Sequence, residues 1–346
     1  MPINSAPSVV IISPALASAN NGNWHTAKRW ARCLAPHARV SIDNEWRGAG
    51  ADLLIALHAR RSAASIAAFA GQHPDRPLIV VLTGTDLYRD IAVDDGAKRS
   101  LALATRLVVL QEEGLRELSP AQAPKATDRS AVSRQPRAAR ELSPAQAPKA
   151  TVIYQSARVL APGRRSRRHF DLALVGHQRP EKDPLTALRA LLRLPAELPV
   201  RLFHVGAALD AGLAAEVAAL GARDARYHWL GPLSPAATRQ RIKRCHLLLL
   251  PSLMEGGANV LIEAVTSGVP VLGSDIAGNR GMLGADYPGW FPVGDPERLA
   301  SLISTAMQDP RYYATLSRRC AERVSLFSPA HECAAVCRLL EWIGQA

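Results

Sequence analysis

The stretch of sequence that decides the fold is LLLLPSLMEGGANVLIEAV, residues 247–265. Four leucines stop at Pro251, a glycine pair follows, and apolar residues then recur at helical spacing. This order predicts a buried strand, a loop and a helix, and the apolar run 269–272 predicts the next strand. One carboxylate, Glu255, falls in the loop, and another, Glu263, falls in the helix. The stretch therefore predicts one strand–loop–helix unit of a parallel sheet, with two carboxylates beside it.

The loop and the start of the helix have the chemistry of a nucleotide-sugar site. Gly256 and Gly257 allow the backbone to approach a ligand closely. The helix expected to begin at Val260, directly after Ala258 and Asn259, offers N–H groups to an anion. A carboxylate accepts two hydrogen bonds at once, which suits a sugar or ribose diol. We therefore expect this segment to bind a nucleotide-sugar, with its two glutamates on the diols.

The first half of the chain alternates short apolar runs with helical stretches. Continuous apolar runs of this length are typical of strands in a parallel sheet that is covered on both faces. The expected strands are 9–12, 53–57, 78–82 and 107–110, and the expected helices are 26–35, 62–70 and 95–105. The alternation predicts βαβ units and a doubly wound, Rossmann-like domain over residues 1–158.

The same alternation restarts near residue 170 and predicts a second Rossmann-like domain over 169–327. The expected strands are 170–175, 200–205, 226–229, 247–250, 269–272 and 290–292, and the expected helices are 184–194, 209–220, 235–244 and 260–267. A last helix, within 328–346, is expected to pack back towards the first domain. Ligands of open α/β sheets bind at the carboxyl ends of the strands, so we expect the two domains to face a central cleft.

One segment is repeated. Residues 116–127 recur without change as residues 140–151, at an offset of 24 residues. A single copy inside a globular domain does not indicate a solenoid, which needs several diverged repeats. The segment is rich in Pro, Ser, Arg and Ala, which predicts a disordered loop over 116–151 without a catalytic role.

Charge and composition bound the partners. The chain has 346 residues, a formal net charge of +12 and 48% hydrophobic but only 5% aromatic residues. Much of the positive charge lies in the connector 164–168 and in the repeat, without interleaved aromatic side chains that could stack on nucleobases. We therefore expect no nucleic-acid partner. No apolar run is long enough to span a membrane.

A cytoplasmic location is predicted from the first strand and the cysteines. The run 9–19 resembles a signal-peptide core, but no basic residue precedes it and a polar segment follows, so a buried strand is the better interpretation. The five cysteines are odd in number and form no CxxC motif, which favours reduced thiols. Cys333 and Cys337 are interpreted as small apolar positions on the last helix rather than as a redox or metal pair.

A second donor element follows the first strand of the second domain. This loop carries Gly176, Arg179 and Lys182 just before a predicted helix. A diphosphate leaving group needs positive charge near its oxygens as the glycosidic bond breaks, so both cations are expected to bind the donor diphosphate. Gly231 and Leu233, after a later strand, are expected beside the nucleobase, although a plain turn fits them equally well.

Polar residues also gather after three strands of the first domain. Because the carboxyl ends of parallel strands meet at one edge of the sheet, these residues are expected to bind the acceptor. They are Asn21, Gly22, Asn23, His25, His58, Arg60, Thr83, Thr85 and Asp86. The basic residues among them suit an anionic acceptor. Asp86 or His58 is a candidate base, although a good nucleophile needs none.

The donor motifs resemble those of the glycogen-synthase-like, family 4 glycosyltransferases, which have the GT-B fold. The resemblance implies that Lys182 binds the donor diphosphate, Glu255 meets the donor sugar and Glu263 meets the ribose. In that group an arginine commonly follows the loop glycine. This chain has His177 there, so Arg179 is the candidate second cation. The candidate catalytic residues are Glu255, Lys182, Arg179 and His25.

Outside the repeat, nearly the whole chain is similar to the selenosugar synthase family. The motifs that carry this resemblance are 21–27, 57–60, 82–88, 152–156, 254–259 and 278–282. It implies that a sugar moves from UDP-N-acetylglucosamine or UDP-glucose to selenophosphate, with release of UDP and then phosphate, which leaves a selenosugar for selenoneine biosynthesis. Selenophosphate is already an anionic nucleophile, so it needs positioning more than deprotonation. No set of metal ligands stands out, and we expect neither metal nor cofactor.

Two other functions fit the sequence. A conventional family 4 enzyme would transfer the sugar to a hydroxyl group and would need a clear base. A basic nucleic-acid-binding or scaffold protein without turnover would bind nucleic acid in a salt-sensitive manner. The sequence does not indicate an oligomeric state.

Overall fold

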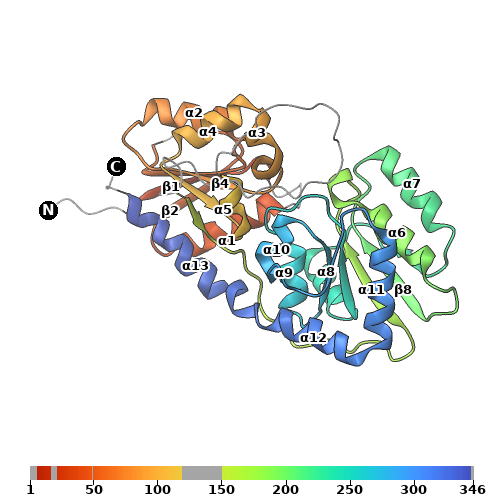
Figure 1. Ribbon diagram of the computed structural model, residues 1–346. Coiled ribbons are helices and arrows are strands. Elements are labelled where there is room, and N and C mark those ends of the chain that lie inside the picture. The colour runs from red at the N-terminus through yellow and green to blue at the C-terminus, as the bar shows by residue number, and fades with distance from the viewer. Residues whose placement is uncertain (1–5, 17–21, 49, 119–149, 344–346) are drawn as a thin grey trace, which may run out of the picture. The chain divides into compact units, whose positions relative to one another are not determined.

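The structure is a computed structural model that describes residues 6–16, 22–48, 50–118 and 150–343. The chain divides into two units (Figure 1). Unit 1 comprises Met1–Tyr154 and Cys333–Ala346, and unit 2 comprises Gln155–Glu332. Each unit is built on a parallel β-sheet with flanking helices, so the predicted α/β class with two doubly wound domains is confirmed.

The sheet of unit 1 has the strand order β2-β1-β3-β4-β5-β6, and its pairings are parallel. Its strands are β1 (Ser8–Ile12), β2 (Arg39–Asp43), β3 (Leu53–Leu57), β4 (Leu78–Leu82), β5 (Arg106–Val109) and β6 (Ala150–Val152). The direction of winding reverses between β1 and β3, which pair directly. Ligands of such sheets bind at the reversal, outside the carboxyl ends of the strands.

The helices of unit 1 connect these strands. They are α1 (Gly22–Leu34), α2 (Ala63–Gln72), α3 (Ile91–Val93), α4 (Asp95–Leu103), α5 (Glu113–Glu117) and the latter part of α13 (Pro329–Cys337). A π-helical turn over Asp86–Asp90 precedes α3, and a 3-10 turn over Arg338–Trp342 extends α13. Figure 1 shows α2 and α4 on one side of the sheet and α1 and α13 on the other.

Alternate residues of each strand enter two separate cores. In β1, Val9 packs in the same core as Trp30 of α1, whereas Val10 packs in the core that contains Phe69 of α2. Both faces of the sheet are therefore buried, which explains why its central strands are continuous apolar runs in the sequence. Val336 and Leu339, near the end of the chain, join the core of Trp30.

Cys33 of α1 and Cys333 of α13 form a disulfide, with their Cα atoms 5.0 Å apart. The expectation of reduced thiols is wrong for this pair, and Cys333 is not a plain apolar position. The two residues are 300 positions apart, and only the packing of α13 in unit 1 brings them together. Cys337 keeps its thiol, which donates to the carbonyl oxygen of Cys33 at 3.5 Å.

The sheet of unit 2 has the strand order β12-β11-β10-β7-β8-β9, again with parallel pairings. Its strands are β7 (Phe170–Val175), β8 (Val200–Val205), β9 (Tyr227–Trp229), β10 (Leu247–Leu250), β11 (Val271–Ser274) and β12 (Trp290–Phe291). The direction of winding reverses between β7 and β10, which pair directly. Loops that follow these two strands therefore meet at one point of the carboxyl edge.

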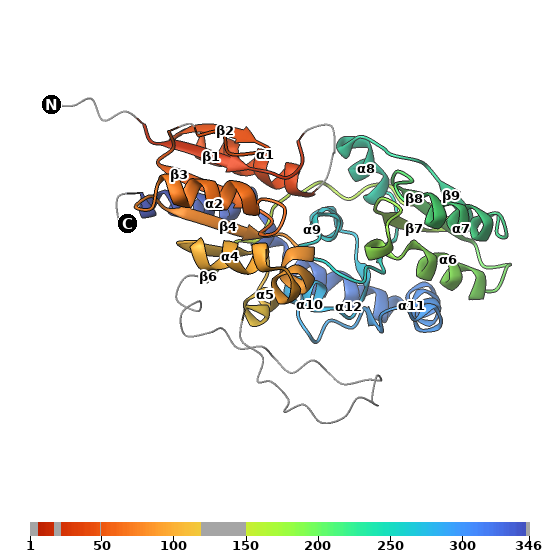
Figure 2. The ribbon, with the colours of Figure 1, turned by 90° about the horizontal axis from the view of Figure 1, so that it is seen from above.

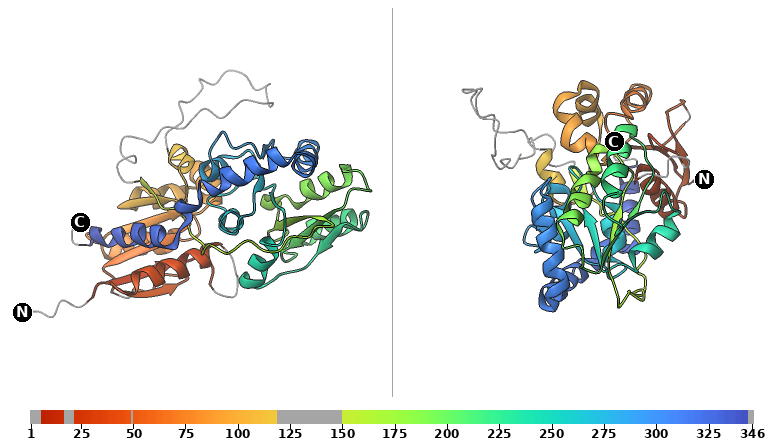
Figure 3. Two further views of the ribbon diagram at one scale, coloured as in Figure 1. Left: turned by 90° about the horizontal axis from the view of Figure 1, so that it is seen from below. Right: turned by 90° about the vertical axis from the view of Figure 1, so that its right-hand side faces the viewer.

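The helices of unit 2 cover both faces of its sheet. They are α6 (Pro184–Arg193), α7 (Ala211–Gly221), α8 (Pro235–Ile242), α9 (Asn259–Val265), α10 (Ala277–Leu283), α11 (Pro296–Gln308) and α12 (Pro310–Ala321), with 3-10 turns over Pro180–Lys182 and Val324–Phe327. Helices α6 and α7 lie on one side of the sheet, and α8 and α9 lie on the other (Figure 2). Right-handed crossovers from β7 to β8 and from β10 to β11 require this arrangement. Figure 3 shows the same layers from two other directions.

Several helix starts of unit 2 are encoded locally. Asp183, Ser234 and Asp295 each precede a proline at the first helical position, and each accepts a hydrogen bond from the N–H three residues later. The side-chain oxygen satisfies one free N–H of the first turn, and proline has no N–H to leave unsatisfied. Asp183 and Ser234 thereby fix the ends of the loops that carry Lys182 and Leu233.

Some elements could not be predicted from apolar runs in the sequence. Strand β2 is an edge strand without fully buried residues, so it contains no continuous apolar run. Of the predicted loop 116–151, Arg116 and Glu117 belong to α5, and Ala150 and Thr151 belong to β6. Leu118 follows α5, and residues 119–149 of that loop lie outside the described residues.

Candidate active site

The loop after β7 carries Lys182 to the reversal point of the unit 2 sheet. Gly176 follows the strand, and the chain then makes the 3-10 turn before α6. A Cβ at Gly176 would lie 3.4 Å from Cγ of Lys182, so the lysine stem packs against the glycine backbone. Asp183 caps α6 with its side chain from a left-handed backbone conformation, φ +41°. The turn and the cap together determine where the lysine points.

Lys182 forms an ion pair with Glu255, which follows β10. Nζ of Lys182 lies 2.6 Å from Oε1 of Glu255, and the same oxygen accepts a 2.6 Å hydrogen bond from Oγ of Ser252. Glu255 is 8% exposed, whereas the Lys182 side chain is 34% exposed. Two residues predicted for the donor site therefore meet at the carboxyl ends of neighbouring strands.

A buried hydrogen-bond network holds this cluster from the β11 side. Oγ of Ser274 donates to the carbonyl oxygen of Ser252 at 2.5 Å, and Nδ2 of Asn279 donates to the carbonyl oxygen of Ser274 at 2.9 Å. Buried groups bonded in series favour one arrangement. A Cβ at Gly278 would overlap the carbonyl oxygen of Glu255, so α10 packs against this backbone only because position 278 is glycine. Sequence reasoning misses the serines because no motif distinguishes them.

The other predicted donor residues lie on the loops and the helix around this cluster. Gly256 and Ala258 are buried in the loop after β10, Gly257 is half-buried between them, and Asn259 begins α9. Arg179 is half-buried immediately before the 3-10 turn. Each of these positions agrees with the strand–loop–helix order that the sequence predicts.

Glu263 lies half-buried on α9, near Arg239 of α8. Burial lowers the pKa of Arg239, and the negative charge of Glu263 opposes that change. Gly231 follows β9 with φ +65°, a left-handed conformation that suits glycine. Leu233 follows it and is half-buried. Gly231 and Leu233 therefore lie in the loop after β9, and Glu263 lies in the helix after β10.

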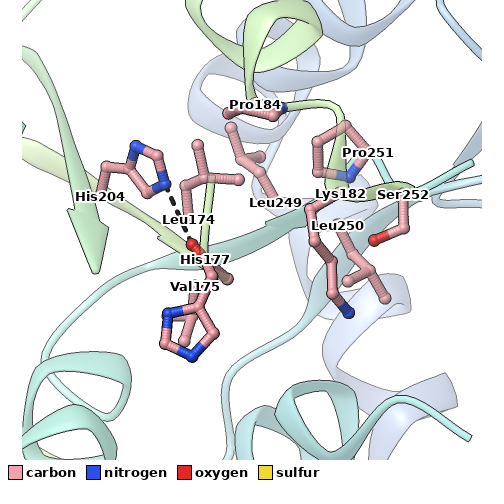
Figure 4. A pocket seen from close by; sticks show the side chains of 11 residues that line it. Leu174, Val175, His177, Lys182, Pro184, His204, Leu249, Leu250, Pro251 and Ser252 are labelled. Atoms are coloured by element: carbon pink, nitrogen blue, oxygen red, sulfur yellow. Dashed lines mark hydrogen bonds between the residues drawn. The ribbon is translucent and has the colours of Figure 1, made fainter. Parts of the chain in front are cut away.

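Sequence reasoning also misses His204, a buried histidine inside β8. It lines a small pocket together with Gly176, His177, Lys182 and Ser252 (Figure 4). Its Nε2 lies 3.2 Å from the carbonyl oxygen of Gly176, so it contacts the lysine-bearing loop. The one sequence signal is a polar residue in an otherwise apolar strand end, and such a histidine is more often structural.

In unit 1, Asp86 joins the loops that follow β3 and β4. Its Oδ1 accepts the N–H groups of Thr83 at 2.9 Å and Gly84 at 2.8 Å, and its Oδ2 accepts the N–H of Ala59 at 2.9 Å. The carboxylate is fully buried. Both oxygens of this carboxylate are therefore committed to backbone N–H groups of the two loops, which is the arrangement of a structural rather than a proton-accepting side chain.

His58 follows β3 in a left-handed conformation, φ +73°, which is uncommon for a residue with a side chain. Its Nδ1 accepts the N–H of Arg61 at 3.3 Å, so Nε2 carries the proton and donates to Oγ1 of Thr85 at 3.0 Å. Burial lowers the pKa of His58, although the nearby Asp86 carboxylate opposes this. The ring is therefore neutral, and both of its nitrogens are engaged.

Arg60 and the α1 residues complete the predicted acceptor set. Arg60 lies 3.5 Å from Asp90 and 3.3 Å from Asp94, so its guanidinium is held in ion pairs. Gly22, Asn23 and His25 form the first turn of α1, after strand β1, and Asn21 lies outside the described residues. Burial lowers the pKa of His25, and the charges of Arg29 and Lys28 add to the effect. Hydrogen bonds join His58 to Thr85 and Thr83 to Asp86, while His25 follows the neighbouring strand.

The described part of the chain has neither a cluster of metal-ligating side chains nor a membrane-spanning helix. Within it, no three His, Cys, Asp or Glu side chains gather as metal ligands would. No helix there is long and apolar enough to cross a membrane.

Comparison with known proteins adds a family match and a fold match. Residues 164–324 match the family model described as Glycosyl transferases group 1. Anabaena Alr3699/HepE, solved in complex with UDP and glucose, is 15% identical over 97% of this chain and 99% of its own, with a TM-score of 0.73. Sucrose-phosphate synthase (tll1590) from Thermosynechococcus elongatus is 16% identical over 96% and 98%, with a TM-score of 0.70.

A third solved structure has the same fold over a shorter span. The pneumococcal O-GlcNAc transferase GtfA, in complex with UDP and GlcNAc, is 17% identical over 84% of this chain and 56% of its own, with a TM-score of 0.64. Identities this low show the fold alone. Most of unit 2 is therefore similar in sequence to the group 1 glycosyl transferases, and the chain as a whole has the two-domain α/β fold of GT-B glycosyltransferases.

Proposed function

We propose that this chain transfers a sugar from a UDP-sugar donor. The observation that carries the proposal is the Lys182–Glu255 pair, a cation and a carboxylate 2.6 Å apart at the reversal point of the unit 2 sheet. The pair lies inside the 164–324 segment that matches the group 1 glycosyl transferases. Solved structures of the same fold hold UDP with glucose or with GlcNAc, which supports a uridine diphosphate sugar as the donor.

Each donor residue has a role in this proposal. Lys182 neutralises the charge that develops on the diphosphate as the bond from the anomeric carbon to oxygen breaks, and Arg179 is the second cation. These side chains supply the positive charge, so the proposal includes no metal. Glu255, held by Ser252, accepts hydrogen bonds from the sugar hydroxyls, and Glu263 accepts them from the ribose. The 256–259 segment, Gly231 and Leu233 contact the donor through the backbone.

We infer that the acceptor is selenophosphate, bound at the carboxyl edge of the unit 1 sheet. Its selenium gives an electron pair to the anomeric carbon, and the breaking C–O bond leaves its pair on UDP. Water then cleaves the P–Se bond, which releases phosphate and leaves the selenosugar. Asp86 is committed to three N–H groups and both nitrogens of His58 are engaged, which supports an acceptor that needs no base.

One observation favours a second acceptor class. His25 is half-buried after β1, and burial together with Arg29 and Lys28 lowers its pKa. A neutral imidazole at this edge is able to take a proton from a hydroxyl group. A conventional transfer to a hydroxyl acceptor is therefore the alternative function, with His25 as its base.

Mass spectrometry of the reaction products separates these functions. We expect the protein, incubated with UDP-N-acetylglucosamine or UDP-glucose and selenophosphate, to release UDP and a selenosugar, with no change when EDTA is added. Glu255→Gln should abolish the product. Glu297→Gln alters a 78% exposed carboxylate of the same unit and should leave product formation unchanged. Transfer to a hydroxyl acceptor alone would reassign the acceptor, and no consumption of any UDP-sugar would overturn the donor assignment.

A further inference from the structure

His204 and Tyr227 form a hydrogen-bonded chain that ends on the lysine-bearing loop. His204 is 1% exposed in β8, and its Nε2 lies 3.2 Å from the carbonyl oxygen of Gly176. Its Nδ1 lies 2.8 Å from the hydroxyl oxygen of Tyr227 in β9. Figure 4 shows the contact from the His204 ring to the loop, with Lys182 and His177 extending in another direction.

The two hydrogen bonds run in one direction, from the Tyr227 hydroxyl through His204 to the carbonyl of Gly176. A carbonyl oxygen only accepts hydrogen bonds, so Nε2 of His204 must carry the proton, and Nδ1 must accept the hydroxyl proton of Tyr227. Burial lowers the pKa of His204 to about 4 and raises the pKa of Tyr227. Both groups are therefore neutral near pH 7, and Tyr227 holds the imidazole in the tautomer that donates to Gly176.

This contact sets the orientation of one peptide group. The carbonyl of Gly176 and the N–H of His177 belong to the same planar trans peptide and point in opposite directions. By holding the carbonyl, His204 directs the N–H of His177 away from itself. Two features keep the peptide in place: Nδ1 of His177 accepts the N–H of Ala207 at 3.0 Å, and a Cβ at Gly206 would overlap the Gly176 carbonyl oxygen.

We propose that His204, oriented by Tyr227, is a positioning residue that turns the Gly176–His177 peptide so that its N–H faces the donor diphosphate. The inference rests on the proposed function, because it assigns the diphosphate to the loop of Lys182. The lysine supplies charge, and the oriented peptide supplies a directed hydrogen-bond donor beside it. Preorganised backbone N–H groups of this kind are effective because they need no rearrangement when charge develops.

Titration with UDP and with uridine tests this role. Uridine has the base and the ribose but no diphosphate, so it reports whether the rest of the site is intact. We expect His204→Leu to weaken UDP binding about tenfold, the size of one lost charge-assisted hydrogen bond, and to leave uridine binding unchanged. His204→Gln, whose amide N–H can reach the same carbonyl, should restore most of the loss. Tyr227→Phe should have an intermediate effect.

His246→Leu is the matched control. His246 also bonds to backbone, because its Nδ1 accepts the N–H of Asp171 at 3.0 Å, but it precedes β10 at the amino end of the sheet. Its loss should lower stability without changing the ratio of UDP to uridine affinity. An equal fall in both affinities for His204→Leu, or no fall in either, would overturn the positioning role.

The other outcomes are also decisive. If His204→Leu does not fold, the test falls to Tyr227→Phe, with His204→Gln as its conservative comparison. A ratio of UDP to uridine affinity equal to the native one in Tyr227→Phe would then contradict the inference. If the native protein binds uridine but gains nothing from the diphosphate, the diphosphate assignment fails. If it binds neither molecule, the proposed function itself fails, which the native titration alone reveals.

Discussion

Glu255 is the residue on which the proposed donor site depends, because Lys182, Ser252 and helix α10 all contact its side chain or backbone. Lys182 and Ser252 both bond to its Oε1, and α10 approaches its carbonyl where Gly278 leaves room. Removing one partner of a largely buried ion pair leaves the other charge uncompensated, which usually destabilises more than replacing both. The pair therefore supports the local structure as well as the donor binding that we propose, and variants at either position need a stability control.

Asp86 is predicted to be structural rather than catalytic. Asp86→Asn keeps the shape but replaces one oxygen with an amide that faces backbone N–H groups, so at least one hydrogen bond is lost. We expect the free energy of unfolding to fall by about 2 kcal/mol, measured by urea denaturation. UDP binding by unit 2 residues should be unchanged. A variant with native stability but no transfer activity would instead make Asp86 the base.

Strand β8 makes stability depend on pH through His204. Burial lowers the pKa of this side chain to about 4 from its ordinary value of 6.5. Below pH 6.5 the unfolded chain binds a proton that the folded protein takes up only near pH 4, so the free energy of unfolding falls as the pH falls through this window. Burial lowers the pKa values of His25, His58 and His246 as well, which acts in the same direction.

Urea denaturation should show this pH dependence. We expect His204 alone to cost about 2 kcal/mol of stability between about pH 7 and pH 5. His204→Gln should be less stable at neutral pH and should lose less on acidification. A native stability that is flat or rises towards pH 5 would contradict the burial of neutral histidines.

Elements were predictable where local sequence determines them. Apolar runs predict β7, β8 and β10 with the observed bounds, because most side chains of a strand that is covered on both faces are apolar. Lys182 and Glu255 could be placed beyond the ends of strands because each follows one of these predicted runs. Their hydrogen-bond partners Ser252, Ser274 and His204 could not, because each depends on which strands become neighbours. The Cys33–Cys333 disulfide depends on the docking of the last helix and has no local signal.

The Cys33–Cys333 disulfide closes most of the chain into one loop, since its cysteines are 300 residues apart. Cross-linking of distant residues restricts the unfolded chain, and loss of a native disulfide typically costs about 2–5 kcal/mol. We expect Cys333→Ser, or reduction with dithiothreitol, to lower the midpoint of urea unfolding. Cys245→Ser alters a buried free thiol and keeps the disulfide, so reductant should lower its midpoint as it does for the native protein, whereas the midpoint of Cys333→Ser should not change with reductant. Identical unfolding of the native protein with and without reductant would show that the disulfide does not form.

The repeated segment allows a deletion that preserves the β6 sequence. Ala150 and Thr151 pair with Leu107 and Val108 of β5, and the earlier copy ends in the same Ala-Thr dipeptide. Deletion of residues 128–151 therefore places an identical dipeptide before Val152. We expect the thermal unfolding midpoint and UDP binding to be unchanged. A large loss of either would assign the segment a structural or functional role.

Calorimetric titration of UDP into the native protein, Lys182→Met and Lys243→Met tests the central claim most directly. Lys243 is the matched control, a half-buried lysine at the end of α8 in the same unit. We predict saturable binding by the native protein and by Lys243→Met, and binding at least about tenfold weaker for Lys182→Met, because the proposal assigns the diphosphate to Lys182. No binding by the native protein, or equal binding by all three, would contradict a UDP-sugar site at the Lys182–Glu255 pair.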